Sequence, residues 1–358
     1  MLYVFYNDID KNKCAKLVLS ELNDSEIEIV PAGNSLWTYR NIIARIVLHL
    51  CFYLHVPCKY NFDSAFIKKI LTIKKTDSIL IFGGGFGISP CISFCFLEYC
   101  KAESKFLWLW DSVHNKTEKR FLKYLKKHYE VYTFDYNDSQ DYKLNYKNTV
   151  GYLPELKQET KKEDKQTTDI YFVGLDRGRY EILNNLYESF SKLGLICDFN
   201  VLKDENSPKK EKALKFVNGR IDSLENIRRI YNSRAVLDIP VDGQNGLTQR
   251  VLEALFLNRK VITNNESIEK EVLYRTENIF ILNHKNLENI KIFLSTPFLE
   301  TKLSQYTINN WITEFTQQSA VSSQQSAVSS QQSAVDYVAR VKFVKYQFVK
   351  TGEIRRCA

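Results

Sequence analysis

The sequence lacks the cysteine patterns of a disulfide or zinc protein. It contains eight cysteines, but none forms a CxxC pair and none has zinc-ligand spacing. Several lie in apolar runs, where a free cysteine behaves as a small buried hydrophobic residue. The N-terminus also lacks the basic segment and long apolar stretch of a signal peptide. We therefore expect a cytoplasmic protein in a reducing compartment, without disulfides.

Long apolar runs are absent too. The most lipid-like segment is IVLHLCFYLHV, residues 46–56, whereas a membrane-spanning helix needs about 20 apolar residues. We favour a buried helix here. The alternative is a surface helix that faces the membrane, preceded by the basic residues Arg40 and Arg45.

Dense clustering of lysine and arginine is also missing. The formal net charge of +8 is mildly basic, which suits anionic ligands or an anionic membrane surface but not a dedicated nucleic-acid binder. A chain of 358 residues with 44% hydrophobic residues has enough apolar side chains for about two cores.

Strand-like and helix-like segments alternate along the chain. In the N-terminal half, strands are predicted at 2–6, 27–32, 77–85, 105–113 and 129–135, with helical patterns in most of the intervals. A second series of strands is predicted at 169–174, 196–202, 235–241, 260–264 and 278–283. Such alternation predicts an α/β protein with two Rossmann-like, doubly wound domains that face a cleft.

The domain boundaries follow from composition. Residues 1–154 form the first predicted domain, the charged tract 155–169 a linker and residues 170–315 the second domain with a closing helix. In the remainder, 316–358, the heptapeptide QQSAVSS repeats ahead of a basic tail. The repeat carries too few apolar positions for a coiled coil and is typical of a low-complexity linker. The tail is either a membrane- or partner-binding segment or an extension without a selected role.

Two glycine-bearing loops follow predicted strands. The first, Gly83 to Gly87, has Pro90 where a dinucleotide-binding loop requires a third glycine, so a nicotinamide site is not favoured. The second lies within FVGLDRGRY, where Gly174 opens a turn that carries Arg177 and Arg179. Backbone N–H groups and guanidinium groups at a strand end suit a diphosphate. An ordinary turn with solvated arginines is the alternative.

A third loop leads into an apolar helix. Gly243 and Gly246 precede Thr248, where the helix begins, and Arg250 and Glu253 share one helix face. A cation near the positive end of a helix is unfavourable unless an anion compensates it. We expect Glu253 to supply part of that charge and a bound phosphate the rest. A weak surface ion pair is the alternative.

These residues resemble a known family. The segment R-x-x-E-A-L followed by K-V-I-T, after a glycine loop in the second of two α/β domains, is similar to the nucleotide-sugar site of GT-B glycosyltransferases. The nearest resemblance is to bacterial enzymes of lipopolysaccharide or capsule biosynthesis. The resemblance implies that Arg250 contacts the donor diphosphate and Glu253 the ribose.

The same resemblance gives roles to the neighbouring residues. It implies that Gly243, Gly246 and Thr248 let the loop approach the phosphates, and that Arg177 and Arg179 add positive charge. It also implies that the final helix, with Trp311 and Phe315, returns to the first domain. Many retaining members have a second glutamate where this chain has Asn245, so both stereochemical outcomes stay open.

The catalytic base of an inverting enzyme is expected in the first domain. Asp111 and His114 follow a predicted strand and fit that position, and Asp8 is the alternative. Of the tryptophans before them, Trp108 and Trp110, at least one is expected in the core, although either is able to stack on a sugar. The Asp8–Asp10 pair is read as a loop and not as a metal site, since arginines and a helix N-terminus suffice for a leaving diphosphate.

The sequence therefore predicts a metal-independent glycosyltransferase that needs no cofactor besides its nucleotide-sugar donor. The expected acceptor is a lipopolysaccharide or another lipid-linked glycan, reached by peripheral contact with the inner membrane, and no nucleic-acid partner is expected. Two alternatives remain: a nucleotide-sugar epimerase of two α/β domains, and a non-catalytic two-lobe binding protein.

Overall fold

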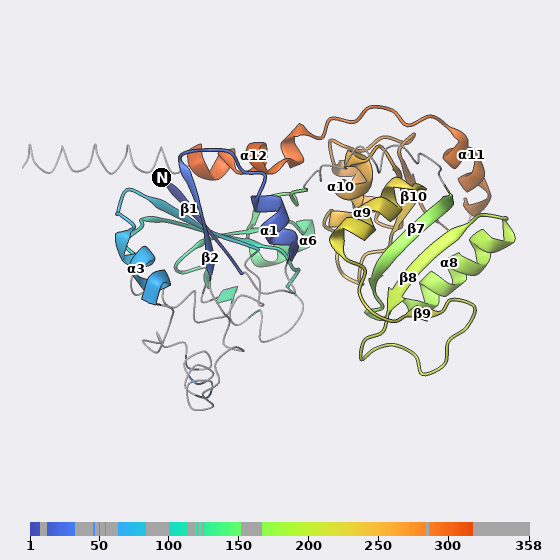
Figure 1. The fold of residues 1–358 in the computed structure, drawn as a ribbon, viewed down its shortest axis with the longest axis horizontal. Coiled ribbons are helices and arrows are strands. Elements are labelled where there is room, and N and C mark those ends of the chain that lie inside the picture. The colour runs from blue at the N-terminus through green and yellow to red at the C-terminus, as the bar shows by residue number, and fades with distance from the viewer. Residues whose placement is uncertain are drawn as a thin grey trace, which may run out of the picture.

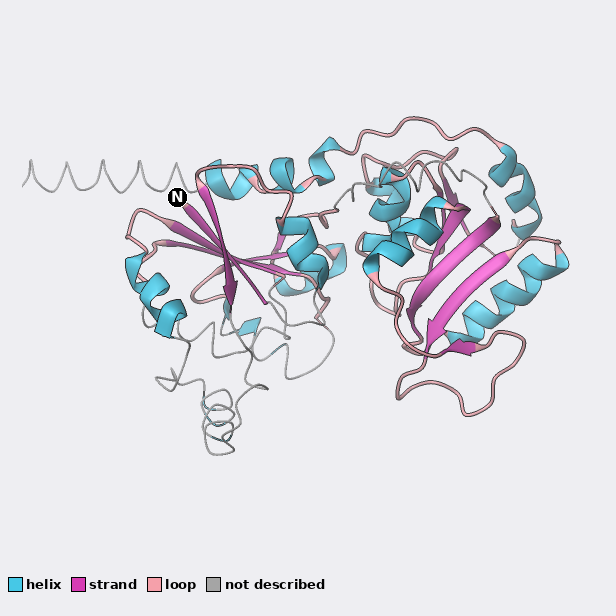
Figure 2. Ribbon diagram, in the orientation of Figure 1, coloured by secondary structure: helices cyan, strands magenta, loops and turns pink. Residues whose placement is uncertain are grey.

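The computed structural model describes most of both predicted domains. The residues described are 1–7, 13–32, 64–83, 100–113, 122–151 and 167–317, without 124, 284 and 285, together with Ile46, Leu50, Leu54 and Lys119. Within these residues the chain forms two units, each built on a six-stranded sheet of parallel strands (Figures 1 and 2). This architecture confirms the predicted fold class of two Rossmann-like domains.

The first sheet has the strand order 2-1-3-4-5-6, so the order of its strands reverses between β1 and β3. From one edge to the other it contains β2 (Ile27–Ala32), β1 (Leu2–Asn7), β3 (Ser78–Phe82), β4 (Ser104–Leu109), β5 (Glu130–Thr133) and β6 (Asn145–Tyr146). Its described helices are α1 (Lys13–Leu19), α3 (Ser64–Thr72) and α6 (Tyr136–Tyr142). Alternate residues of the strands belong to two hydrophobic clusters. The sheet is therefore covered on both faces, which explains why strands such as β3 read as continuous apolar runs.

The second sheet has the order 3-2-1-4-5-6 of a dinucleotide-binding fold. Its strands are β9 (Phe216–Val217), β8 (Cys197–Leu202), β7 (Thr168–Leu175), β10 (Ser233–Asp238), β11 (Lys260–Thr263) and β12 (Ile279–Ile281). The helices are α8 (Tyr180–Lys192), α9 (Ser223–Tyr231), α10 (Gln249–Phe256) and α11 (Ile290–Ser295), with 3₁₀ turns η3 (Glu266–Lys270), η4 (Leu287–Asn289) and η5 (Ser304–Tyr306). The strand order reverses between β7 and β10, the point where such sheets bind ligands.

The end of the described chain returns to the first domain. After α11 the backbone runs across to α12 (Ile308–Trp311), which lies beside the first sheet (Figure 1). Trp311 and Phe315 are fully buried in the cluster that also contains Trp108. The Nε1 of Trp311 donates to the carbonyl of Asn148 at 2.7 Å. The expected return of the closing helix is thus confirmed.

The structure adds elements that the sequence did not predict. Helix α6 and the two-residue strands β6 and β9 are new, and β7 begins at Thr168, inside the tract read as linker. Residues 152–166, the repeats and tail from 318 onward, and the Asp8–Asp10 pair lie outside the described residues. So does most of the Gly83–Gly87 loop, of which only Gly83 is described.

The apolar segment 46–56 differs from the favoured interpretation. Its three described residues, Ile46, Leu50 and Leu54, are helical and are 53%, 54% and 68% exposed. The expectation of a buried helix is wrong for these three side chains. No helix among the described residues is long and apolar enough to cross a membrane.

Candidate functional site

A cavity of about 280 Å³ lies between the domains at the point where the second sheet reverses. The loops after β7 and β10 form one wall, and residues at the ends of β4 and β5 form the other. Six of the predicted site residues line it: Asp111, Gly174, Arg177, Arg179, Thr248 and Arg250. Residues far apart in the sequence are therefore brought to one site.

Arg250 is held by a buried carboxylate. Its Nη2 lies 3.0 Å from Oδ1 of Asp238, and its Nε donates to the same oxygen at 3.1 Å. Asp238 ends β10 and is 1% exposed. The predicted partner, Glu253, makes no ion pair with Arg250, because the strand end lies closer to the guanidinium than the next helical turn. The expected pairing of Arg250 with Glu253 is therefore wrong, and Asp238 is the compensating anion.

Arg179 is almost completely buried beside Arg250. Its Nε donates to the carbonyl of Asp176 at 3.0 Å, and its two terminal nitrogens donate to the carbonyls of Ile239 and Leu175. Burial, followed by repulsion from Arg250, lowers the pKa of Arg179 to about 10. These contacts use three of the five guanidinium N–H groups. The others have no partner among the described residues, so the group retains donors for an anion.

Gly174 lies close to the guanidinium groups of both arginines. A Cβ atom at this position would lie 3.3 Å from Nη2 of Arg179 and 3.4 Å from Nη1 of Arg250. Both guanidinium groups also lie against the ring of Phe172, with centroid distances of 5.6 and 5.4 Å. The glycine that the sequence placed in a phosphate loop therefore leaves space for cations as well as for backbone approach.

Gln249 is a site residue that the sequence pattern does not indicate. It lines the cavity at the first position of α10. Both polar atoms of its amide are buried and have no hydrogen-bond partner among the described residues. Buried amides without partners are rare, because each lost hydrogen bond is costly.

In the remainder of the loop after β7, a residue with strained backbone, Arg177, follows a buried carboxylate, Asp176. Arg177 is exposed and has a φ of +47°, and its backbone N–H donates to Oδ2 of Asp204 at 2.6 Å. The adjacent Asp176 is fully buried, and its two carboxylate oxygens have no hydrogen-bond partner among the described residues. Its charge partly offsets that of Arg179, and Arg177 lines the cavity wall.

The first domain contributes the opposite wall. Asp111 is exposed at the cavity edge, with Trp110 and Ser112 on either side of it. Trp108 is fully buried in the core, so only Trp110 of this pair faces the cavity. His114, the second candidate base, lies outside the described residues.

The glycines of the third loop lie apart from the cavity lining. Gly243 has a φ of +80° and shapes a turn, while Gly246 lies against Phe134 of the first domain. Thr248 lines the cavity, and its hydroxyl donates to Oδ1 of Asp238 at 2.7 Å. The predicted contact of the two glycines with phosphates stays a prediction, because the lining consists of their neighbours Gln244 and Leu247.

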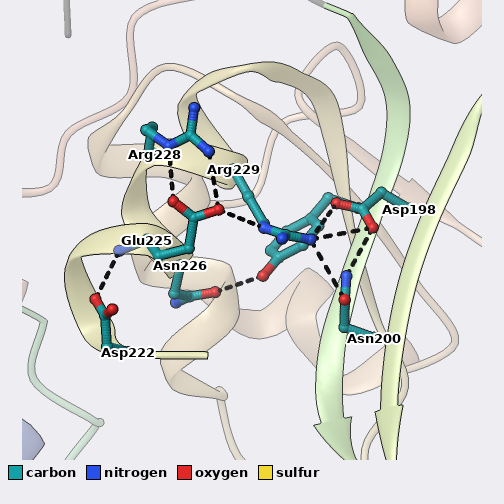
Figure 3. A network of polar contacts seen from close by, with 8 residues as sticks. Asp198, Asn200, Asp222, Glu225, Asn226, Arg228 and Arg229 are labelled. Atoms are coloured by element: carbon teal, nitrogen blue, oxygen red, sulfur yellow. Dashed lines mark hydrogen bonds and ion pairs between the residues drawn. The ribbon is translucent and has the colours of Figure 1, made fainter. Parts of the chain in front are cut away.

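Glu253 lies one helical turn below the cavity and is 6% exposed. Its Oε2 accepts a hydrogen bond of 3.2 Å from the amide of Asn226, whose oxygen accepts from the Tyr171 hydroxyl at 3.0 Å. Asn226 adjoins the polar network of α9 and β8 that Figure 3 shows. Burial raises the pKa of Glu253 to about 7, although Asn226 and Arg250 act in the opposite direction.

Comparison with known proteins identifies the fold. No protein-family model and no curated protein sequence matches the chain. Among solved structures, a UDP-forming α,α-trehalose-phosphate synthase from Burkholderia vietnamiensis aligns with a TM-score of 0.53 at 10% identity, over 89% of this chain and 99% of that one.

Two further structures have the same arrangement. The E. coli trehalose-6-phosphate protein bound with UDP-2-fluoro glucose has a TM-score of 0.53 at 12% identity, over 89% of this chain and 99% of that one. The N-terminal domain of Candida albicans trehalose-6-phosphate phosphatase gives 0.51 at 10% identity, over 89% and 96%. At such identities the likeness is one of fold, and the chain has the two-domain architecture of GT-B glycosyltransferases.

Proposed function

We propose that the protein is a glycosyltransferase whose nucleotide-sugar donor binds in the cavity between the domains. The observation that carries the proposal is the meeting of Arg177, Arg179 and Arg250 at the reversal point of the second sheet. Guanidinium groups bind diphosphate oxygens through paired N–H donors. The structural neighbour from E. coli with UDP-2-fluoro glucose has the same fold, which supports a nucleotide sugar as the ligand.

The same arginines support transfer without a metal. As the bond between the sugar and the diphosphate breaks, negative charge grows on the leaving phosphate oxygens. Fixed cations and the N-terminus of α10 stabilise such charge in a site of low dielectric constant. Activity that persists in excess EDTA is the expected result, and complete loss restored by Mg²⁺ would contradict metal independence.

Asp111 is the proposed catalytic base for an inverting reaction. Asp111 is exposed and lines the first-domain wall of the cavity, where a carboxylate is able to accept the proton of an acceptor hydroxyl as that oxygen attacks the sugar. Asp111→Asn should abolish transfer while the donor still binds. If transfer continues at the wild-type rate, Asp111 is not the base.

The donor assignment is tested by a thermal-shift screen of UDP-, GDP-, ADP- and CMP-sugars. At least one should raise the melting temperature of the wild type, since a ligand that binds only the folded state stabilises it. Arg177→Ala should weaken that shift without lowering the basal melting temperature, because the Arg177 side chain is exposed. A chain that responds to none of these donors would overturn the proposal.

For the acceptor we propose a lipid-linked glycan, approached through peripheral membrane contact. The support is the exposure of the apolar side chains of Ile46, Leu50 and Leu54, together with the basic net charge. Replacing the three residues by serine should weaken sedimentation with vesicles containing anionic phospholipid. Equal sedimentation of variant and wild type would remove the support from this face.

A further inference from the structure

The carboxylate of Asp135 joins the two domains. Asp135 lies two residues after the end of β5, directly before α6, and is fully buried. Its Oδ1 caps helix α6 by accepting the backbone N–H groups of Asn137 at 2.9 Å and Asp138 at 3.2 Å. This oxygen therefore acts as an ordinary helix N-cap within the first domain.

The other oxygen faces the second domain. Oδ2 accepts the backbone N–H of Asn245 at 2.8 Å and that of Gly246 at 3.1 Å, and the hydroxyl of Ser112 at 3.3 Å. One buried carboxylate therefore accepts five hydrogen bonds from three separate segments. Such charge-assisted bonds are stronger than neutral ones.

The backbone of Gly246 confirms how closely the loop approaches. A Cβ atom there would lie 2.5 Å from a ring carbon of Phe134 and 2.6 Å from its carbonyl oxygen. The carbonyl belongs to the main chain beside Asp135 and has little freedom to move. Only glycine at 246 permits the contact with Asp135.

The contact joins segments that belong to both walls of the cavity. Asn245 and Gly246 lie between Gln244 and Leu247, which line the second-domain wall, and Ser112 is adjacent to Asp111 on the first. We propose that Asp135 is a positioning residue that latches the loop after β10 to the first domain and thereby sets the distance between Asp111 and the arginines. The latch itself depends only on the geometry, and its effect on donor binding rests on the proposed function.

Asp135→Asn tests the latch sharply because an amide has only one acceptor oxygen. That oxygen is able to cap α6 or to accept from the loop, but not both, and the NH₂ group would then face N–H donors. Asp222→Asn is the matched control, since the Asp222 side chain caps α9 by accepting the N–H of Glu225 at 2.9 Å (Figure 3) and makes no hydrogen bond to the described residues of the first domain. Gly246→Ala breaks the same contact from the opposite side.

Two measurements are made on the full chain. Small-angle X-ray scattering should give a larger radius of gyration for Asp135→Asn and for Gly246→Ala than for the wild type and Asp222→Asn. Calorimetry with the most tightly bound of UDP, GDP and ADP should show about tenfold weaker binding in the two latch variants, and no further loss in the double variant, because both remove one contact.

Each outcome is decisive. Unchanged scattering and affinity in folded Asp135→Asn, or additive losses in the double variant, would overturn the latch. If Asp135→Asn does not fold, Gly246→Ala decides alone. If the wild type binds none of the three nucleotides, the proposed function fails while the scattering comparison still tests the latch.

Discussion

Arg179 and Arg250 share one aromatic partner, with their guanidinium carbons 5.6 and 5.4 Å from the ring centroid of Phe172. Two cations this close repel each other, and the lowered pKa of Arg179 reflects that repulsion in addition to burial. Asp238 compensates only Arg250 through an ion pair. Asp176 offsets part of the charge of Arg179, and Arg177 adds a third cation at the cavity wall. The site therefore favours an anionic ligand.

Arg250→Ala should weaken nucleotide binding and also destabilise the fold. The substitution leaves the carboxylate of Asp238 buried without its cation, and breaking such a pair costs about 3–5 kcal/mol in the free energy of unfolding. The double variant Arg250→Ala/Asp238→Asn should regain much of that stability but not the affinity. Denaturant unfolding and calorimetry separate the two effects, and restored binding in the double variant would show that Arg250 acts only through the ion pair.

Gln249→Leu should change stability and affinity in opposite directions. Removing a buried amide that has no partner among the described residues should stabilise the unliganded protein by about 1–2 kcal/mol. If the amide binds the donor, the same change should weaken nucleotide binding about tenfold. Thermal melts with and without nucleotide measure both effects. Lower basal stability would indicate that the amide already has a partner.

Glu253→Gln should remove a pH dependence of stability. Because the folded state raises the pKa of Glu253 from 4.5 to about 7, the folded protein retains this proton after the unfolded chain has lost it. Stability should therefore fall as pH rises through this window, by about 3 kcal/mol in total. The difference between variant and wild type in urea unfolding should grow in the variant's favour from pH 5 to pH 8. A constant difference would show that Glu253 has an ordinary pKa.

Trp311→Ala should destabilise the first domain, although Trp311 lies near the end of the described chain. Its side chain is 1% exposed and packs edge-on against Trp108, with ring centroids 5.0 Å apart. Replacing it by alanine should therefore lower the free energy of unfolding by about 3–5 kcal/mol. Trp110→Ala, at the cavity edge, should cost less.

Truncation of the chain after Gln317 should leave a folded protein, whereas truncation before Ile308 should expose the first-domain core to bis-ANS.

The loops of the site are more predictable from the sequence than the contacts within them. The loops after β7 and β10 were predicted because glycines and arginines follow apolar strands, and such local patterns need no knowledge of tertiary structure. Arg250 was paired with Glu253 because spacing along a helix is readable from sequence. Its actual partner, Asp238, lies 12 residues earlier, where only the folded loop brings it close.

The contacts between the two domains could not be predicted from the sequence for the same reason. Asp135 reads as an ordinary strand end, and helix α6 after it has too little apolar periodicity to be predicted. Nothing in the sequence indicates that its carboxylate meets Gly246, 111 residues away. Gln249 was overlooked because an isolated glutamine at a helix start is usually solvated, and its burial depends on the facing domain.

The return of α12 has a consequence during protein synthesis. The first domain lacks Ile308, Trp311 and Phe315 until the ribosome has translated the whole second domain. At roughly 5–20 residues per second, the stretch from 151 to 308 takes roughly 10–30 s. For that time one face of the first sheet is missing part of its apolar cover, so the earlier domain in the chain is the later one to complete its fold.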